Sequence, residues 1–210
     1  MLTLAPSVTL WDSGEFLAAI QSLGIPHPPG TPLYVVLGKV WSTAFAPVFG
    51  FARSVNLLSA VCTAAGCGIL ASLFARWTDD GLAATAAGVT AGLMSTVWLS
   101  ATETEVYAVA LLFGCWILWA GDRAGLRSDA RWILLLSYVA GLSWTLHLTP
   151  LLVLPSAILL AFTTHDGYFA VPVGKRRVDG RRDGISMGRV LAWALLLALL
   201  GMSFVAVMYL

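Results

Sequence analysis

Four carboxylates stand in two short motifs whose residue types and spacing are suited to acid–base chemistry. In a helix, residues three apart share a face, so Asp12 and Glu15 are expected to point the same way. A carboxylate in such a place can take a proton from a hydroxyl group, which makes Asp12 a candidate general base. The first motif contains Asp12 and Glu15, and the second contains Glu103 and Glu105.

Both motifs also have the sequence of a helix cap. Asp12 with Glu15, and Thr102 with Glu105, have the spacing of a capping box, in which side chains bond the free N–H groups at the start of a helix. A cap alone is a sufficient explanation of the first motif. In the second motif, two carboxylates in so short a link at the bilayer edge are more than a cap requires. Both interpretations stay open on the sequence alone.

Four cationic or imidazole side chains could serve these acids. His27 lies in residues 26–32, where four prolines predict an extended, rigid path, and its ring could pair with a phosphate or a carboxylate. Lys39 and Arg53 could offset the charge of a phosphate leaving group. They could equally snorkel from an interfacial helix and anchor a span. His147 stands where two apolar runs meet, and lines either a site or a helix contact.

The sequence contains no pattern for a metal or a phosphate-binding loop. Its three cysteines fall inside apolar runs, without a CxxC pair or a partnering histidine. We therefore expect neither a metal site nor a cofactor.

The composition requires that the positioning elements lie in a membrane. Of 210 residues, 59% are hydrophobic and 11% are charged, whereas a soluble domain carries about 25% charged residues. This excludes a soluble enzyme and a nucleic-acid binder. At about 20 apolar residues per spanning helix, there is room for about five to seven spans. The expected fold class is all-α, a polytopic transmembrane helical bundle.

The apolar runs divide a single transmembrane domain, residues 1–210, into loops and spans. Residues 11–53 are expected to form the first outer loop with interfacial helices, one of them over residues 13–23. A basic cytoplasmic loop is expected at residues 164–189. Because both ends stop within apolar runs, the chain is expected to be a fragment of a longer protein. The expected spans are residues 54–75, 82–100, 106–121, 132–148, 150–163 and 190–210.

The basic residues predict the orientation of this domain. Residues 31–50 could span the membrane or lie along its outer surface. If they lie along the surface, ten of the 12 Lys and Arg residues fall on the cytoplasmic side, all except Lys39 and Arg53. The same orientation brings both acidic motifs and His147 to one outer face.

The motifs resemble, in order, the signatures of the protein O-mannosyltransferase-like membrane proteins of the GT-C glycosyltransferase superfamily. The resemblance implies a GT-C-like fold and covers essentially the whole chain. One position departs from the pattern, because Leu146 stands where a polar residue such as Asn is expected before His147. The similar segments are residues 4–16, 24–34, 103–108 and 141–149.

The resemblance also implies roles for the singled-out residues. Asp12 matches the catalytic base, and Glu105, or else Glu103, matches the second outer-loop acid. Glu15 is grouped with the catalytic residues because it shares a helical face with Asp12. Substrate-binding roles are expected for His27, Lys39, Arg53, Glu103 and His147.

The implied reaction is an inverting transfer of a sugar, expected to be mannose, from a polyprenyl- or dolichyl-phosphate donor. The acceptors are Ser or Thr hydroxyls of proteins on the extracytoplasmic face of a multi-pass membrane protein, expected in a bacterial inner membrane. The partners are thus membrane lipid, the lipid-linked donor and a protein or peptide acceptor, with no nucleic acid. Two alternatives stay open. One is a transporter or lipid flippase, disfavoured by spans whose polar residues are mainly Ser and Thr, and the other is a non-catalytic membrane assembly protein.

Overall fold

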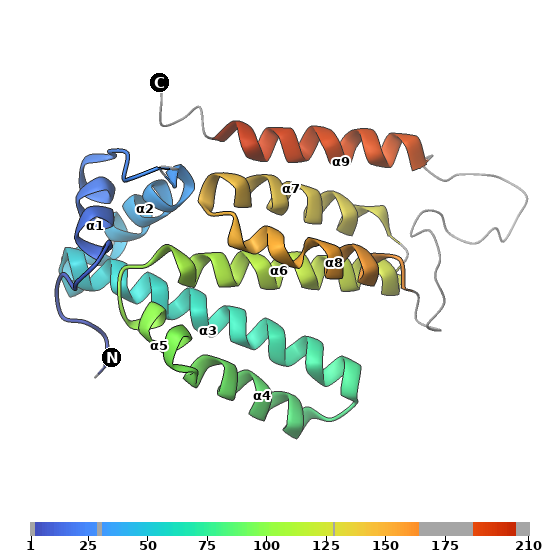
Figure 1. Ribbon diagram of the computed structural model, residues 1–210, viewed down its shortest axis with the longest axis horizontal. Coiled ribbons are helices and arrows are strands. Elements are labelled where there is room, and N and C mark those ends of the chain that lie inside the picture. Colours follow the sequence, from blue (N-terminus) through green and yellow to red (C-terminus); the bar gives the residue numbers. More distant parts are fainter. Residues whose placement is uncertain (1–2, 29–30, 128, 164–186, 205–210) are drawn as a thin grey trace, which may run out of the picture.

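The helices of the computed structural model run back and forth along one bundle (Figure 1). Residues 3–28, 31–127, 129–163 and 187–204 are described. Every element within them is helical, which confirms the all-α fold class. The elements are α1 (Ser13–Ser22), α2 (Pro32–Phe49), α3 (Phe51–Thr78), α4 (Gly81–Leu93), α5 (Ser95–Thr102), α6 (Val106–Arg127), α7 (Ala130–Leu146), η1 (Thr149–Val153), α8 (Leu154–Ala161) and α9 (Met187–Met202).

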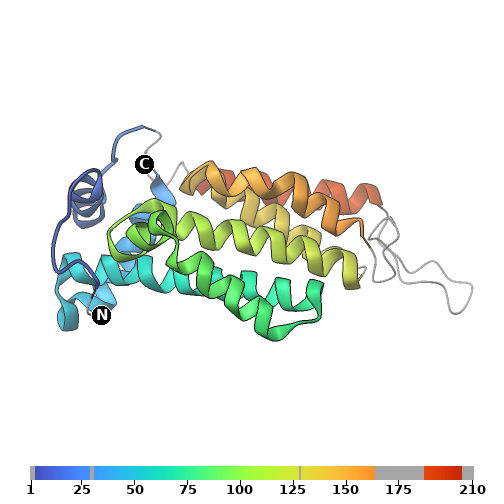
Figure 2. The same cartoon turned by 60° about the horizontal axis from the view of Figure 1, so that its bottom comes forward.

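The path of the chain brings four distant segments to one end of the bundle. α3 leads away from α1 and α2, α4 and α5 return beside it, and α6 leads away again (Figures 1 and 2). α7 returns to the same end, and η1 with α8 leads away once more. α6 packs against α3, α7 and α8, and so forms the centre of the bundle. The starts of α3 and α6 and the end of α7 therefore lie with α1.

Three of the described helices, α2, α3 and α6, are long and apolar enough to cross a membrane. α4 and α5 together are long and apolar enough to be a fourth candidate span, but the chain bends by 66° between them. The single span expected at residues 82–100 is thus broken. The break lies at Met94, whose φ of −59° and ψ of 136° leave the helical region.

The span expected at residues 150–163 is also divided, into η1 and α8. Both elements carry a proline in their first two positions, where the missing N–H costs no helical hydrogen bond. Residues 164–186 and 205–210 lie outside the described residues, and with them most of the expected basic loop and the end of the last expected span. α2 qualifies as a span by length and composition, so its placement along the outer surface stays a prediction.

Two helix pairs approach closely at glycines. A Cβ atom on Gly121 of α6 would meet the carbonyl of Ala157 in α8, and one on Gly141 of α7 would meet the carbonyl of Ala198 in α9. Such contacts let helix backbones pack together where no hydrophobic effect drives association. A Cβ atom on Gly68 of α3, by contrast, would meet no atom of the described residues within 4 Å.

α1 confirms the helix expected at residues 13–23, but its apolar side faces protein. Phe16, Leu17 and Ile20 are buried, and the Phe16 ring packs edge-on against Tyr34 of α2 with centroids 5.2 Å apart. Leu23 ends the helix in a left-handed conformation and is 52% exposed. The apolar stripe therefore fixes α1 on α2, and the polar start of α1 faces outward.

Candidate active site

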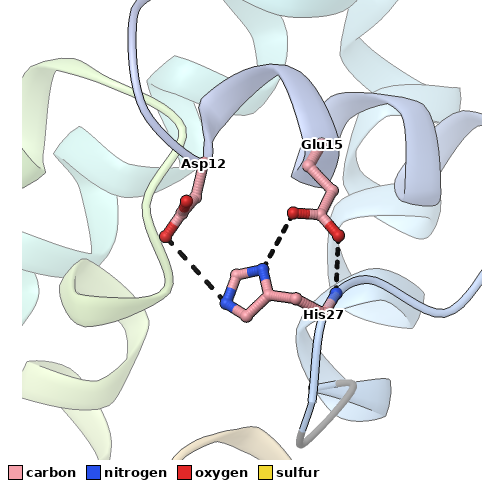
Figure 3. A group of neighbouring side chains, drawn as sticks. All are labelled: Asp12, Glu15 and His27. Carbon is pink, nitrogen blue, oxygen red and sulfur yellow. Dashed lines mark hydrogen bonds and ion pairs between the residues drawn. The ribbon is translucent and has the colours of Figure 1, made fainter.

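Asp12, Glu15 and His27 come together at the start of α1 (Figure 3). The backbone N–H of His27 donates to Glu15 Oε1 at 2.6 Å, and His27 Nδ1 lies 2.8 Å from Glu15 Oε2. The other ring nitrogen, Nε2, is 3.9 Å from Asp12 Oδ2. The imidazole of the proline-rich loop therefore stands between the two carboxylates of the first motif.

The structure excludes the capping-box interpretation of both motifs. Asp12 makes no side-chain capping bond to α1, and the Glu15 carboxylate is occupied by His27. In the second motif, the Thr102 hydroxyl donates back to the carbonyls of Trp98 and Leu99, at 3.1 and 3.2 Å, inside α5. The acids are therefore not accounted for as helix caps.

The Glu15–His27 contact shifts the pKa of both partners. The hydrogen bonds from His27 lower the pKa of Glu15 below its ordinary value. The bond to Glu15 raises the pKa of His27 and outweighs partial burial, while the charges of Asp12 and Glu105 raise it further. His27 consequently holds its second proton to higher pH than an isolated imidazole does.

Glu105 faces this cluster from the link between α5 and α6. Burial raises its pKa to about 7, and the charges of Asp12 and Glu103 add to the shift, while His27 opposes it. This mutual influence places the two motifs beside one another, as expected from the sequence. A carboxyl group that titrates near neutral pH can either donate or accept a proton.

A buried amide connects the two motifs, and the sequence reasoning did not identify it. Asn56 of α3 donates through Nδ2 to the carbonyls of Ala5 and Ser7, at 2.9 and 3.3 Å. The Thr104 hydroxyl donates to Asn56 Oδ1 at 2.5 Å, and the Ala5 N–H donates to the Thr102 carbonyl at 3.0 Å. Asn56 and Thr104 are both fully buried. We call this group the Asn56 clamp.

One signal in the sequence could have revealed the clamp. Asn56 is the one amide side chain in the predicted span of residues 54–75, whose other polar side chains are Ser and Thr. A buried amide without partners is costly in an apolar environment, so it is expected to bind nearby backbone or side-chain groups.

A cavity of about 850 Å³ lies between α3, α5, α6 and η1 beside the acids. Trp11, Glu103, Glu105 and Tyr107 line it together. Along α6 the lining reaches Leu118, about 18 Å from the start of the helix at 1.5 Å per residue. The lining away from the acids is mainly apolar and includes Leu70, Leu111, Cys115, Leu118 and Val153.

His147 lies beside this cavity at the end of α7. Its Nδ1 accepts the backbone N–H of Thr149 at 3.2 Å and is 2.8 Å from the Thr149 hydroxyl oxygen. Because a backbone N–H can only donate, the ring proton is on Nε2. The ring packs edge-on against Tyr107, with centroids 5.1 Å apart, and Tyr107 lines the cavity.

Lys39 and Arg53, the two cations expected to bind phosphate, differ from each other in their hydrogen bonding. Lys39 Nζ donates to the carbonyl of Gln21 at 2.6 Å and so ties α2 to the last turn of α1. Arg53 lies in the first turn of α3, and its buried Nε–H has no hydrogen-bond partner among the described residues. Lys39 is thus already engaged, and Arg53 is not among the residues that line the cavity described above.

Asp12, Glu15 and His27 are also the described residues best placed to hold a metal ion. Their candidate ligand atoms all lie within 4.8 Å of one another, and all three residues are exposed. In the structure His27 Nδ1 bonds directly to Glu15, so Nε2 and the Asp12 carboxylate are the groups that face each other across an open distance.

Comparisons with known proteins identify related sequences. Residues 12–168 match the family model described as the protein O-mannosyl-transferase TMEM260 N-terminal domain. The chain is 34% identical over 120 residues to protein O-mannosyl-transferase TMEM260 of Mus musculus, which covers 53% of this chain and 16% of that protein. It is 23% identical over 126 residues to protein O-mannosyl-transferase tmem260 of Dictyostelium discoideum, covering 57% and 15%. The aligned part is thus a small share of these relatives. No solved structure matches the chain.

Proposed function

The chain belongs to the family of the protein O-mannosyl-transferase TMEM260 N-terminal domain, and on this premise we propose that it supplies the acidic site of a membrane O-mannosyltransferase. The proposed reaction moves one mannose from a polyprenyl- or dolichyl-phosphate donor to a Ser or Thr hydroxyl of a protein. It takes place on the extracytoplasmic face. The observation that carries the proposal is the cavity with acids at one end and an apolar lining along α6.

The shape of the cavity suits the two parts of a lipid-linked sugar. Leu111, Leu118 and Val153 offer an apolar surface for the isoprenoid chain, and the sugar phosphate would lie near Glu103 and Glu105. Apolar walls with a few converging polar groups are the usual composition of a small-molecule site. A water-soluble sugar nucleotide would have no use for the apolar part.

Asp12 is the proposed base. Its carboxylate is 56% exposed, so a protein acceptor can approach it from solvent. It takes the proton of the acceptor hydroxyl as that oxygen attacks the anomeric carbon of mannose. The bond from this carbon to the phosphate oxygen breaks, and the lipid phosphate leaves with the electron pair. One displacement of this kind inverts the anomeric configuration.

Glu105 is proposed to act on the phosphate. An ionised carboxylate would repel the phosphate, but a group whose pKa is raised to about 7 is largely protonated below that pH and can donate a hydrogen bond. The Nε2–H of His147, whose ring packs on the cavity-lining Tyr107, is a further candidate donor to the leaving group. These neutral donors are proposed to replace a metal ion.

Glu15 and His27 are proposed to hold the proline-rich segment that contains His27 against the start of α1. Their two hydrogen bonds hold residues 27 and 15 together across a turn of proline-rich chain. His27 also lies between Asp12 and Glu15, and its imidazole is proposed to offset the charge of these acids.

A transfer assay tests this function. The longest reading frame that contains the chain is expressed in membranes and supplied with polyprenyl-phosphate-mannose carrying a labelled sugar and a Ser/Thr-rich peptide. We expect label on the peptide, with and without EDTA, and none on a peptide in which Ser and Thr are replaced by Ala. Transfer that EDTA abolishes would overturn the proposal that the reaction needs no metal ion. Absence of transfer from any lipid-linked sugar would favour transport or an assembly role.

A further inference from the structure

Trp11 has two unusual properties in one residue. Its backbone has a φ of 63°, in the left-handed region that a bulky side chain rarely adopts. Its side chain is 90% exposed, the most exposed large hydrophobic group described in the structure. A strained backbone under an unburied indole is a combination that the packing of the fold does not account for.

The position of Trp11 adds a third observation. It directly precedes Asp12, and it lines the cavity together with Glu103, Glu105 and Tyr107. Tyr107 is 51% exposed and its ring is supported by His147. The acidic end of the cavity is therefore flanked by two accessible aromatic rings.

An aromatic belt at the membrane surface explains an exposed Trp, because the amphipathic indole favours the headgroup region. A belt residue needs neither a left-handed backbone nor a place on the wall of a cavity. Backbone strain of this kind is found where a side chain must be aimed at a ligand. The geometry thus favours a ligand contact.

We propose that Trp11 is the platform on which the sugar ring of the lipid-linked donor stacks, next to Asp12. This inference rests on the proposed function and adds a subsite to it. One face of a pyranose ring presents C–H groups, which pack on the electron-rich face of an indole. With the phosphate near Glu105 and the sugar on Trp11, the anomeric carbon lies between the two acidic motifs.

Two substitutions separate the ring from the backbone strain. Trp11→Asn removes the ring and relieves the strain, because Asn adopts the left-handed conformation more readily than other residues with a side chain beyond Cβ. Trp11→Phe keeps both an aromatic face and the strained backbone. A sugar platform predicts that Trp11→Asn raises the Tm by about 2–4 °C. It also predicts that the affinity for the mannosylated lipid falls about three- to tenfold in Trp11→Asn and less in Trp11→Phe.

The test compares two lipids, polyprenyl-phosphate-mannose and bare polyprenyl phosphate, binding to the same full-length protein in nanodiscs. We expect Trp11→Asn to lose affinity for the mannosylated lipid only. Equal loss for both lipids would show a contact with the lipid chain, and no loss would show a belt residue; either result overturns the proposal. A lower Tm in Trp11→Asn would overturn the argument from strain.

The same measurements distinguish this inference from the proposed function. If wild-type protein binds the mannosylated lipid more tightly and loses that preference in Trp11→Asn, but transfers nothing, the reaction is wrong and the sugar platform stands. If transfer occurs and Trp11→Asn leaves the binding of both lipids unchanged, the reaction stands and the platform is wrong. Wild-type protein that binds neither lipid would overturn both.

Discussion

The carboxylates of this site differ in the protonation state that their surroundings favour. Glu15 accepts two hydrogen bonds from His27, which lower the pKa of Glu15 and favour its ionised form. Glu105 is partly buried near other acids, so its neutral form is favoured. Asp12 is exposed and caps no helix. A solvent-facing base and a protonated donor are therefore assigned to different motifs, following the rule that environment divides roles between like groups.

The raised pKa of Glu105 predicts the pH dependence of transfer. The folded protein keeps the Glu105 proton up to about pH 7, so the hydrogen-bond donor is present below that pH and is lost as pH rises through it. Wild-type kcat should therefore fall on the alkaline side of about pH 7. In Glu105→Gln, which is neutral at every pH, this decline should disappear.

A second variant checks the sign of this assignment. Glu103 raises the pKa of Glu105, so Glu103→Gln should move the alkaline decline to lower pH. A decline that is unchanged in both variants would show that another group titrates there.

At the scale of the elements, two segments set the distance between the motifs: the residues before α1 and the link between α5 and α6. The Asn56 clamp binds residues before α1 and residues between α5 and α6 to the same position of α3. The motif of Asp12 and the motif of Glu105 are therefore held by one buried amide.

Thr104 offers a matched pair of variants for the clamp. Thr104→Val removes the hydroxyl at nearly constant volume and leaves Asn56 Oδ1 without this donor, which should cost about 1–3 kcal/mol of stability. It should also lower kcat, because the acids lose their common support. Thr104→Ser keeps the hydroxyl and should retain most of both. Thermal unfolding in detergent and transfer at equal folded protein measure the two effects, and equal behaviour of Val and Ser variants would contradict the clamp.

The elements also show where sequence pattern is informative. Runs expected at residues 106–121 and 132–148 correspond to α6 and α7, because long apolar periodicity is a strong local signal. The bend at Met94 is not predicted although Gly92 and Ser95 flank it, because small residues of this kind are also common in straight membrane helices. The pairing of His27 with Glu15 and the contacts of Asn56 depend on how distant segments meet. The motifs could be found in the sequence, but their hydrogen-bond partners could not.

At the scale of the whole molecule, the acidic site and a buried ion pair lie at opposite ends of the described part of the bundle. The acidic site lies where α3 and α6 begin, and Arg76 and Arg123 lie near where the same helices end (Figure 1). At that far end Asp122, only 2% exposed, pairs with Arg76 and accepts the indole N–H of Trp77 at 3.1 Å. The cytoplasmic side predicted for these basic residues stays a prediction.

This separation predicts that stability and catalysis can be changed independently. Asp122→Ala leaves Arg76 and Trp77 without their partner and should cost about 3–5 kcal/mol of stability. Asp122→Asn keeps an acceptor for Trp77 and should cost less. Per folded molecule, the donor KM should be that of wild type in both variants. A changed KM at equal folded protein would show that the two ends are coupled.

The most direct test of the account compares wild type with Asp12→Asn in mannose transfer from polyprenyl-phosphate-mannose. Because Asp12 makes no capping bond, Asn at this position removes the base without removing a helix cap. We expect equal expression, equal Tm and unchanged donor affinity, with transfer reduced by about 100-fold or more. Transfer by Asp12→Asn at the wild-type rate would contradict the assignment of Asp12 as the base.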